Sequence, residues 1–221
     1  MRSLGMGPGG SEREIKGLGV GLMMELGYVK EVSGLILSNI KEIIDQIDEG
    51  EIEGMVREIM ESRDRKILLL GSGRSGFVGK AFALRLMHLG FNVYVSGETI
   101  TPALSPDDLV IAISGSGVTR TVVTQAEVAK EIGARVIAIT SHPDSPLAKI
   151  ADRLVLVKGR SKIDVEPDYE RRQIIGRFDP TPLGTMFELS AMVFLDCVIV
   201  DLIRRLGISE LDLRKKHATV E

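Results

Sequence analysis

Five short apolar runs, separated by segments of helical periodicity, are the feature that most constrains the fold of this chain. The runs are rich in Leu, Val and Ile and cover residues 67–70, 93–95, 109–113, 136–139 and 154–157. Continuous apolar runs of this length are typical of strands buried on both faces of a parallel sheet. Residues 78–89 and 122–132 have a helical period and supply the crossovers that such a sheet requires. The sequence therefore predicts a doubly wound α/β fold with about five parallel strands flanked by helices.

Segments outside this alternating pattern are also informative. Apolar residues recur at three- and four-residue steps over 29–47, which predicts an amphipathic helix, and a second helix is expected over 52–62. The charged segment 158–179 is expected to be a loop that leads to a last helix, 185–206. That helix is apolar nearly all round, which indicates deep burial or a subunit interface.

The glycine-rich residues 1–28 are predicted to be a flexible arm, or sequence upstream of a start at Met23 or Met24. Residues 29–221 are predicted to form a single domain. No secretory signal pattern is found in the arm. The one cysteine, Cys197, lies in an apolar run, where a small buried hydrophobic residue is expected and no disulfide within the chain is possible.

Charge and composition argue against two classes of partner. The formal net charge is −3 and only 4% of the residues are aromatic, so the chain has neither a basic phosphate-tracking surface nor a base-stacking platform. Its uncharged stretches are far shorter than the ~20 apolar residues that cross a bilayer. We therefore expect no nucleic acid, no membrane association and a cytoplasmic location.

Two glycine-serine loops follow the first and third predicted strands, at 71–76 (GSGRSG) and 114–119 (SGSGVT), and each leads into a helix. In a flavodoxin-like sheet of order 2-1-3-4-5, the carboxyl ends of strands 1 and 3 flank the point where ligands bind. Both loops would then face one pocket. Glycines let the backbone approach an anion, hydroxyls donate hydrogen bonds to it, and helix N-termini add partial positive charge. The pattern favours a site for a phosphate monoester.

Other interpretations of these loops stay open. Ser72, Ser75, Ser116 and Thr119 could each merely cap a helix. Residues 71–76 also match G-x-G-x-x-G, with Glu98 past the second strand, which is the pattern of a dinucleotide site. A nucleotide-dependent oxidoreductase would need a substrate domain, however, and little chain remains after the fifth strand. No two histidines have metal-ligand spacing, so no metal site is expected.

Further motifs accompany the two loops: Arg85-Leu86-Met87-His88-Leu89-Gly90, Gly97-Glu98-Thr99-Ile100-Thr101-Pro102, Pro182-Leu183-Gly184-Thr185-Met186-Phe187-Glu188 and Lys216-His217. With them, the chain from about residue 29 onward resembles the sugar isomerase (SIS) domain family and, within it, the 6-phospho-3-hexuloisomerases. The resemblance implies an enzyme without cofactor, usually a homotetramer, that interconverts 3-hexulose 6-phosphate and fructose 6-phosphate. Such an enzyme belongs to the ribulose monophosphate pathway and works either in formaldehyde fixation or in making pentose phosphates.

The resemblance also implies which residues bind the substrate. It makes the hydroxyls of Ser72, Ser114, Ser116 and Thr119 the phosphate ligands. Arg74 is expected to neutralise phosphate or enediolate charge, or to pair with a carboxylate instead. Glu98 is expected to bind sugar hydroxyls or to be a solvated loop carboxylate, and His88 either binds substrate or packs in the core. The full substrate-binding set is Ser72, Gly73, Arg74, Ser75, His88, Glu98, Ser114, Gly115, Ser116 and Thr119.

Two residues are expected to carry the catalysis. Moving a carbonyl from C3 to C2 requires a proton to leave C2 and return at C3 through an enediolate, and one carboxylate can do both steps. Glu188 matches the catalytic glutamate of the family, although Thr185-x-x-Glu188 is also a capping box, in which Glu188 would only close the helix end. His217 could carry the proton between O2 and O3, in its own or a neighbouring subunit, or be a solvated terminal residue.

Two other functions are compatible with the same pattern. A different phosphosugar isomerase, such as an arabinose 5-phosphate isomerase, commonly carries an extra regulatory region for which this chain is too short. A non-catalytic sugar-phosphate sensor usually carries a DNA-binding helix-turn-helix, and the acidic segment before residue 67 offers no basic recognition helix.

Overall fold

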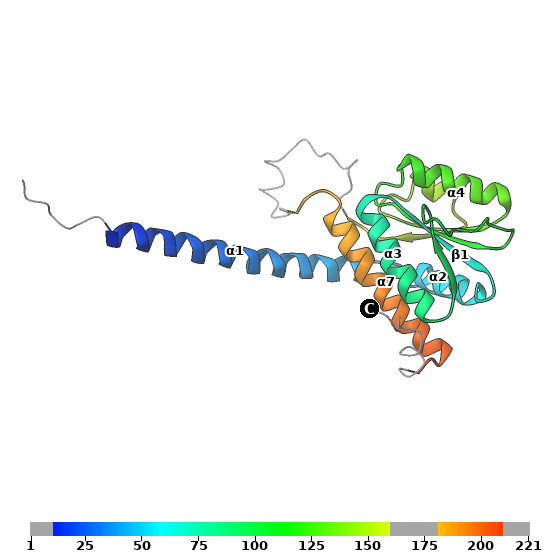
Figure 1. Ribbon diagram of the computed structural model, residues 1–221, viewed down its shortest axis with the longest axis horizontal. Helices are drawn as coiled ribbons and strands as arrows, with labels where there is room; N and C mark the ends of the chain where they lie inside the picture. The colour runs from blue at the N-terminus through cyan, green and yellow to red at the C-terminus, as the bar shows by residue number, and fades with distance from the viewer. Residues whose placement is uncertain (1–10, 160–180, 210–221) are drawn as a thin grey trace, which may run out of the picture. The chain divides into compact units, whose positions relative to one another are not determined.

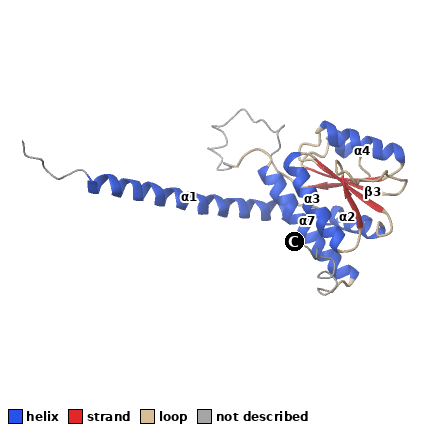
Figure 2. Ribbon diagram, viewed as in Figure 1, coloured by secondary structure: helices blue, strands red, loops and turns tan. Residues whose placement is uncertain are grey.

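A sheet of five parallel strands forms the centre of the computed structural model, which describes residues 11–159 and 181–209. The strands are β1 (Lys66–Gly71), β2 (Asn92–Val95), β3 (Leu109–Ile113), β4 (Arg135–Thr140) and β5 (Arg153–Leu156). They are arranged in the order β2-β1-β3-β4-β5, and all neighbours are parallel. Figure 2 shows the strands of the sheet in red and the helices in blue. The predicted α/β class and strand order are therefore confirmed. The order also differs from the 3-2-1-4-5 of the usual dinucleotide fold.

Helices cover both faces of the sheet (Figure 1). On one face α2 (Glu49–Glu61), α3 (Gly73–His88) and α7 (Thr185–Leu206) pack against residues such as Ile111 and Ile113. On the other, α4 (Arg120–Ile132) and α5 (Pro146–Ile150) pack against Val110 and Ala112. Because successive strand residues point to opposite faces, the apolar run of β3 is buried throughout.

Carboxylates hold together the edge of the sheet at which the strands begin. Asp108 accepts hydrogen bonds from the backbone N–H groups of Lys66 (3.0 Å) and Ser105 (2.7 Å), and Asp152 accepts one from the N–H of Val136 (2.8 Å). Lys66 Nζ also lies 3.1 Å from Asp108. Side chains thus satisfy backbone donors at the amino ends of β1 and β4, and the opposite edge is left to the glycine-serine loops.

The helix α2 is fixed to the sheet by a buried carboxylate. Glu58 accepts hydrogen bonds from Arg153 Nε (2.8 Å) and Arg135 Nη1 (2.5 Å), which join α2 to the starts of β5 and β4. At the exposed end of this layer, Glu53 binds both Nη groups of Arg205 at 2.9 and 2.6 Å, which joins α2 to α7. The hydrogen bonds from Arg205 lower the pKa of Glu53.

The N-terminal part of the chain differs from the sequence-based expectation. Helix α1 covers Ser11–Asp45, so residues 11–28 are helical where a flexible arm was expected. In the sequence, apolar residues at positions 15, 18, 22 and 26 continue the helical spacing upstream, and this periodicity outweighs the glycines between them. The chain divides into two units inside this helix, residues 1–39 and 40–221, rather than at residue 28.

Helix α7 also corrects an expectation. Phe194, Val198 and Leu202 are buried in the core, but Cys197 is exposed, and Val200 is 66% exposed. Residues 193, 197 and 200 follow one another at steps of four and three, and therefore share the helix face that points away from the core. The prediction that Cys197 is buried was wrong because the helix is apolar on more faces than the core covers.

None of the helices among the residues that the model describes is long and apolar enough to span a membrane.

Candidate functional site

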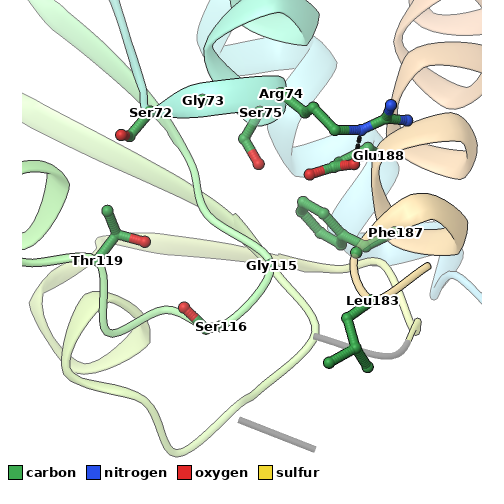
Figure 3. Close-up of a pocket in the computed structure, with 11 residues that line it drawn as sticks. Ser72, Gly73, Arg74, Ser75, Gly115, Ser116, Thr119, Leu183, Phe187 and Glu188 are labelled. Atoms are coloured by element: carbon green, nitrogen blue, oxygen red, sulfur yellow. Dashed lines mark hydrogen bonds and ion pairs between the residues drawn. The ribbon is translucent and has the colours of Figure 1, made fainter. Parts of the chain in front are cut away.

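A pocket of about 180 Å³ lies at the carboxyl ends of β1 and β3, where the two glycine-serine loops meet the start of α7 (Figure 3). It is lined by Ser72, Gly73, Arg74, Ser75, Gly115, Ser116, Thr119, Leu183, Gly184, Phe187 and Glu188. Both loops do face one pocket, as the strand order predicts. Seven of these residues were expected to bind substrate, and Glu188 was expected to be catalytic.

The turn between β1 and α3 depends on two glycines that touch each other. A Cβ at Gly71 would lie 2.9 Å from the Cα of Gly76 and 2.9 Å from the carbonyl oxygen of Ser75. The chain can therefore turn directly from the strand into the helix, where Gly76 N–H donates to the Ser72 carbonyl at 3.3 Å. This tight turn places Ser72, Arg74 and Ser75 in the first turn of α3, beside the pocket.

The turn between β3 and α4 is held by its own hydroxyl groups. Ser114 Oγ and Thr119 Oγ1 lie 2.9 Å apart, and Gly117 N–H donates to the Ser114 carbonyl at 3.0 Å. Ser116 Oγ accepts a long hydrogen bond from Val118 N–H at 3.4 Å. Ser114 is only 2% exposed and is absent from the pocket lining, so its contact with the pocket is through Thr119.

The two N-cap hydroxyls do not act as helix caps. Ser72 is the N-cap of α3 and Thr119 the N-cap of α4, yet neither side chain accepts a capping hydrogen bond. By contrast, Asp48 caps α2 and Ser145 caps α5 in the usual way. At Ser72 and Thr119 the capping interpretation is therefore wrong, and the N–H groups at both helix starts, which no N-cap side chain satisfies, can donate to an anion together with the nearby hydroxyls.

Glu188 lies in the first turn of α7 and faces the β1–α3 turn. Its carboxylate accepts a hydrogen bond from Arg74 Nε across the pocket (Figure 3). The N-cap of α7 is Gly184, with no side-chain capping bond, and Thr185 is already inside the helix. A capping box would need Thr185 at the N-cap. That interpretation of Glu188 is therefore wrong, and its side chain is directed to the pocket.

Phe187 packs between the two sides of the pocket. Its ring is 1% exposed, and a Cβ at Gly115 would lie 2.8 Å from it. A Cβ at Gly159 would similarly lie 2.7 Å from the backbone nitrogen of Phe187. The start of α7 can approach the β3–α4 loop and the segment after β5 this closely only because Gly115 and Gly159 have no side chain. Sequence reasoning missed Leu183, Gly184 and Phe187 as lining residues, although the 182–188 motif contains all three.

Two expected substrate-binding residues lie away from this pocket. His88 is at the opposite end of the 16-residue helix α3, roughly 22 Å from its start at 1.5 Å per residue, and lines a different cavity with Arg85 and Asp196. Glu98 pairs with Lys80 Nζ at 2.7 Å and lies on a third cavity beside β2. A motif shows which residues occur together in the chain, but not how far a helix separates them. His217 lies outside the described residues.

The pocket has little net charge. Among its lining residues that the model describes, Arg74 and Glu188 alone carry formal charges, and these cancel. The starts of α3 and α4 add partial positive charge from their backbone N–H groups. Within the described parts of the chain, no group of three His, Cys, Asp or Glu residues could hold a metal ion. Hydroxyls, N–H groups and one guanidinium can bind a phosphate, and one carboxylate beside them can move a proton.

Comparison with known proteins identifies the family of the chain. Residues 60–164 match the family model of the SIS domain. An uncharacterized protein of Aeropyrum pernix is 53% identical over 197 residues, 87% of this chain and 91% of that protein. A Mycobacterium gastri protein named 3-hexulose-6-phosphate isomerase is 35% identical over 202 residues, 88% of this chain and 96% of that protein.

A solved structure is also similar over nearly the whole chain. It is a hypothetical protein of Methanococcus jannaschii for which a molecular function of 3-hexulose-6-phosphate isomerase was inferred. It superposes with a TM-score of 0.69 at 34% identity and covers 88% of this chain and 99% of that one. Family model, sequence relatives and fold agree, and the chain belongs to the SIS domain family.

Proposed function

We propose that this protein is a phosphosugar isomerase that interconverts 3-hexulose 6-phosphate and fructose 6-phosphate through an enediolate. The observation that carries the proposal is the placement of Glu188 opposite two hydroxyl-bearing loops whose N-cap hydroxyls make no capping bonds. The relatives named 3-hexulose-6-phosphate isomerase, at 34–35% identity, support this choice of substrate. In line with the family, we further propose a cytoplasmic homotetramer.

The phosphate of the substrate is proposed to bind between the β1–α3 and β3–α4 loops. Ser72, Ser75, Ser116 and Thr119 would donate from their hydroxyls, and the helix starts would donate from backbone N–H groups. Ser114 would act indirectly, because its hydroxyl holds that of Thr119. Neutral donors of this kind bind a dianion reversibly, so that an enzyme can release its product.

Glu188 is proposed to move the proton between carbons. In the forward direction its carboxylate removes the proton from C2, the C2–H electron pair forms the C2–C3 double bond, and the C3 carbonyl π electrons go to O3. Glu188 then returns the proton to C3 as the O2 electron pair forms the C2 carbonyl. The proton on O2 moves to O3, and we propose His217 for that transfer. No oxidant is needed, because the carbonyl only changes place.

The proposal predicts a specific isotope exchange. In D₂O, fructose 6-phosphate incubated with the protein should exchange its C3 hydrogen for deuterium, because the 2,3-enediolate releases that proton to Glu188 and then to solvent. Proton NMR of the sugar measures the loss of the H3 signal. The Glu188→Gln variant is nearly isosteric and should lose most of this exchange, by roughly 10²–10⁴-fold, while its melting temperature and its binding of fructose 6-phosphate are retained.

Other results would change the assignment. Exchange at C1 instead of C3 would indicate a 1,2-enediolate, as formed by an aldose–ketose isomerase. Binding of fructose 6-phosphate without exchange at either carbon would favour a sensor. In the synthetic direction, 3-hexulose 6-phosphate made from ribulose 5-phosphate and formaldehyde by a synthase should yield fructose 6-phosphate, which a coupled dehydrogenase assay detects.

A further inference from the structure

Arg74 and Glu188 are hydrogen-bonded to each other in the pocket (Figure 3). The hydrogen bond from Arg74 Nε to the carboxylate ties up the group that must accept a proton from carbon. We infer that the phosphate of the substrate takes Arg74 away from Glu188, so that the base is released only when a phosphate is seated in the loops. This inference rests on the proposed function and adds a control step to the same site.

The charges in the pocket favour such an exchange of partners. Of the described residues that line the pocket, Arg74 is the one with a positive charge, and Glu188 is its present partner. A phosphate monoester brings up to two negative charges, against one on the carboxylate. A guanidinium binds phosphate oxygens with two parallel hydrogen bonds, which a single Nε–carboxylate contact does not match. The incoming dianion is therefore the stronger competitor for Arg74.

The two partners differ in how freely they can move. The Arg74 side chain is 60% exposed, whereas that of Glu188 is 14% exposed and lies in the first turn of α7. Because water solvates the guanidinium side of this pair, the attraction between the two groups is weakened by screening on that side. Among the residues that the model describes, the two Nη groups of Arg74 make no hydrogen bond that would hold the side chain in place. Arg74 is thus the partner that moves, and Glu188 the one that stays.

The backbone of Arg74 lies beside the proposed phosphate site. It belongs to the first turn of α3, together with Ser72, Gly73 and Ser75, which form one wall of the proposed phosphate site. In Figure 3 its side chain leaves this wall and points to Glu188 on α7. A change of side-chain rotamer alone could bring the guanidinium back over its own turn.

The exchange can be observed without turnover by following the Arg Nε–Hε signals in ¹H–¹⁵N NMR spectra while inorganic phosphate is added. The Arg74 signal is assigned by its loss in the Arg74→Lys variant. Arg85 is a matched control, because it lies on the same helix and faces Asp196 at 4.0 Å, outside the pocket. We expect the Arg74 signal to shift with the same saturation curve as the backbone amides of residues 72 and 116, and the Arg85 signal to stay unchanged.

Each other result has a definite meaning. If the loop amides respond to phosphate and the Arg74 signal does not, Arg74 stays with Glu188 and the inference is wrong, while the proposed function stands. If the loop amides respond to neither phosphate nor fructose 6-phosphate, the proposed phosphate site itself is wrong.

A kinetic comparison then tests the consequence for the base. In Arg74→Gln, kcat/KM for fructose 6-phosphate should fall, but the rate of C3 exchange in fructose, which has no phosphate, should rise, because Arg74 no longer holds Glu188. An unchanged or lower rate with fructose would overturn the inference.

Discussion

At the scale of single residues, the site separates groups that face the ligand from groups that hold them. Ser116 and Thr119 line the pocket, whereas Ser114 is buried behind Thr119 and holds its hydroxyl. Hydroxyl groups in the same short loop therefore differ in what they do. The burial of each hydroxyl shows which role it has. The sequence pattern alone does not distinguish one serine from another.

Gly115 is predicted to tolerate no side chain. A Cβ there would lie 2.8 Å from the ring of Phe187, a contact that forces the loop or the helix to move. We expect Gly115→Ala to lower the free energy of unfolding by about 1–3 kcal/mol, as measured by urea denaturation, and to weaken phosphate binding. Gly34→Ala serves as the control, because a Cβ there meets nothing within 4 Å and alanine favours helix. Equal stability of the two variants would contradict the packing argument.

At the scale of secondary-structure elements, Asp108 joins the starts of two strands, β1 and β3, by accepting backbone hydrogen bonds. Burial raises the pKa of Asp108, but hydrogen bonds from the backbone of Lys66 and Ser105 outweigh it, and the pKa lies below its ordinary value of 3.8. The carboxylate form is thus favoured in the folded state. Asp108 therefore stabilises the junction of β1 and β3 at pH values above 3.8, and this stabilisation is lost as the pH falls through the lowered pKa.

The Asp108→Asn variant tests this role. An amide keeps one acceptor and loses the charge and the second acceptor, so the free energy of unfolding at neutral pH should fall by about 1–3 kcal/mol. The difference from the wild type should shrink as the pH falls below 3.8, where Asp108 is protonated first in the unfolded chain, and should be smallest below the lowered pKa of the folded state. Asp107→Asn removes the same charge at the exposed neighbouring position and should have little effect. A difference between Asp108→Asn and wild type that is independent of pH would contradict the electrostatic explanation.

The bounds of the strands and helices were the part of the structure that the sequence predicted best. The runs at 67–70 and 109–113 and the helical segment at 185–206 identified β1, β3 and α7 nearly to the residue, because burial on both faces leaves continuous apolar runs. The glycine-serine loops followed from those strand ends. The sequence did not predict distances between elements. Phe187 contacts Gly115 because α7 packs back against the sheet. His88 lies far from the pocket because it is at the other end of α3.

At the scale of the whole molecule, the chain divides within α1, and residues 1–39 form a unit of their own. Tyr28 and Val29 are more than half exposed, whereas Ile40 and Ile47 are buried in residues 40–221. A chain lacking residues 1–34 should therefore keep the melting temperature of the intact protein, as measured by calorimetry. A lower melting temperature would show that the removed part of α1 contributes to stability, within one chain or between copies.

The edge of the sheet that is held by Asp108 and Asp152 and the edge that carries the pocket share no side chain. Substitutions that alter what the loops recognise therefore leave the polar contacts at the strand starts intact. A laboratory search for new specificities should therefore randomise the pocket-lining residues 72, 74, 75, 116 and 119, and keep the strand starts and the glycines of both loops constant.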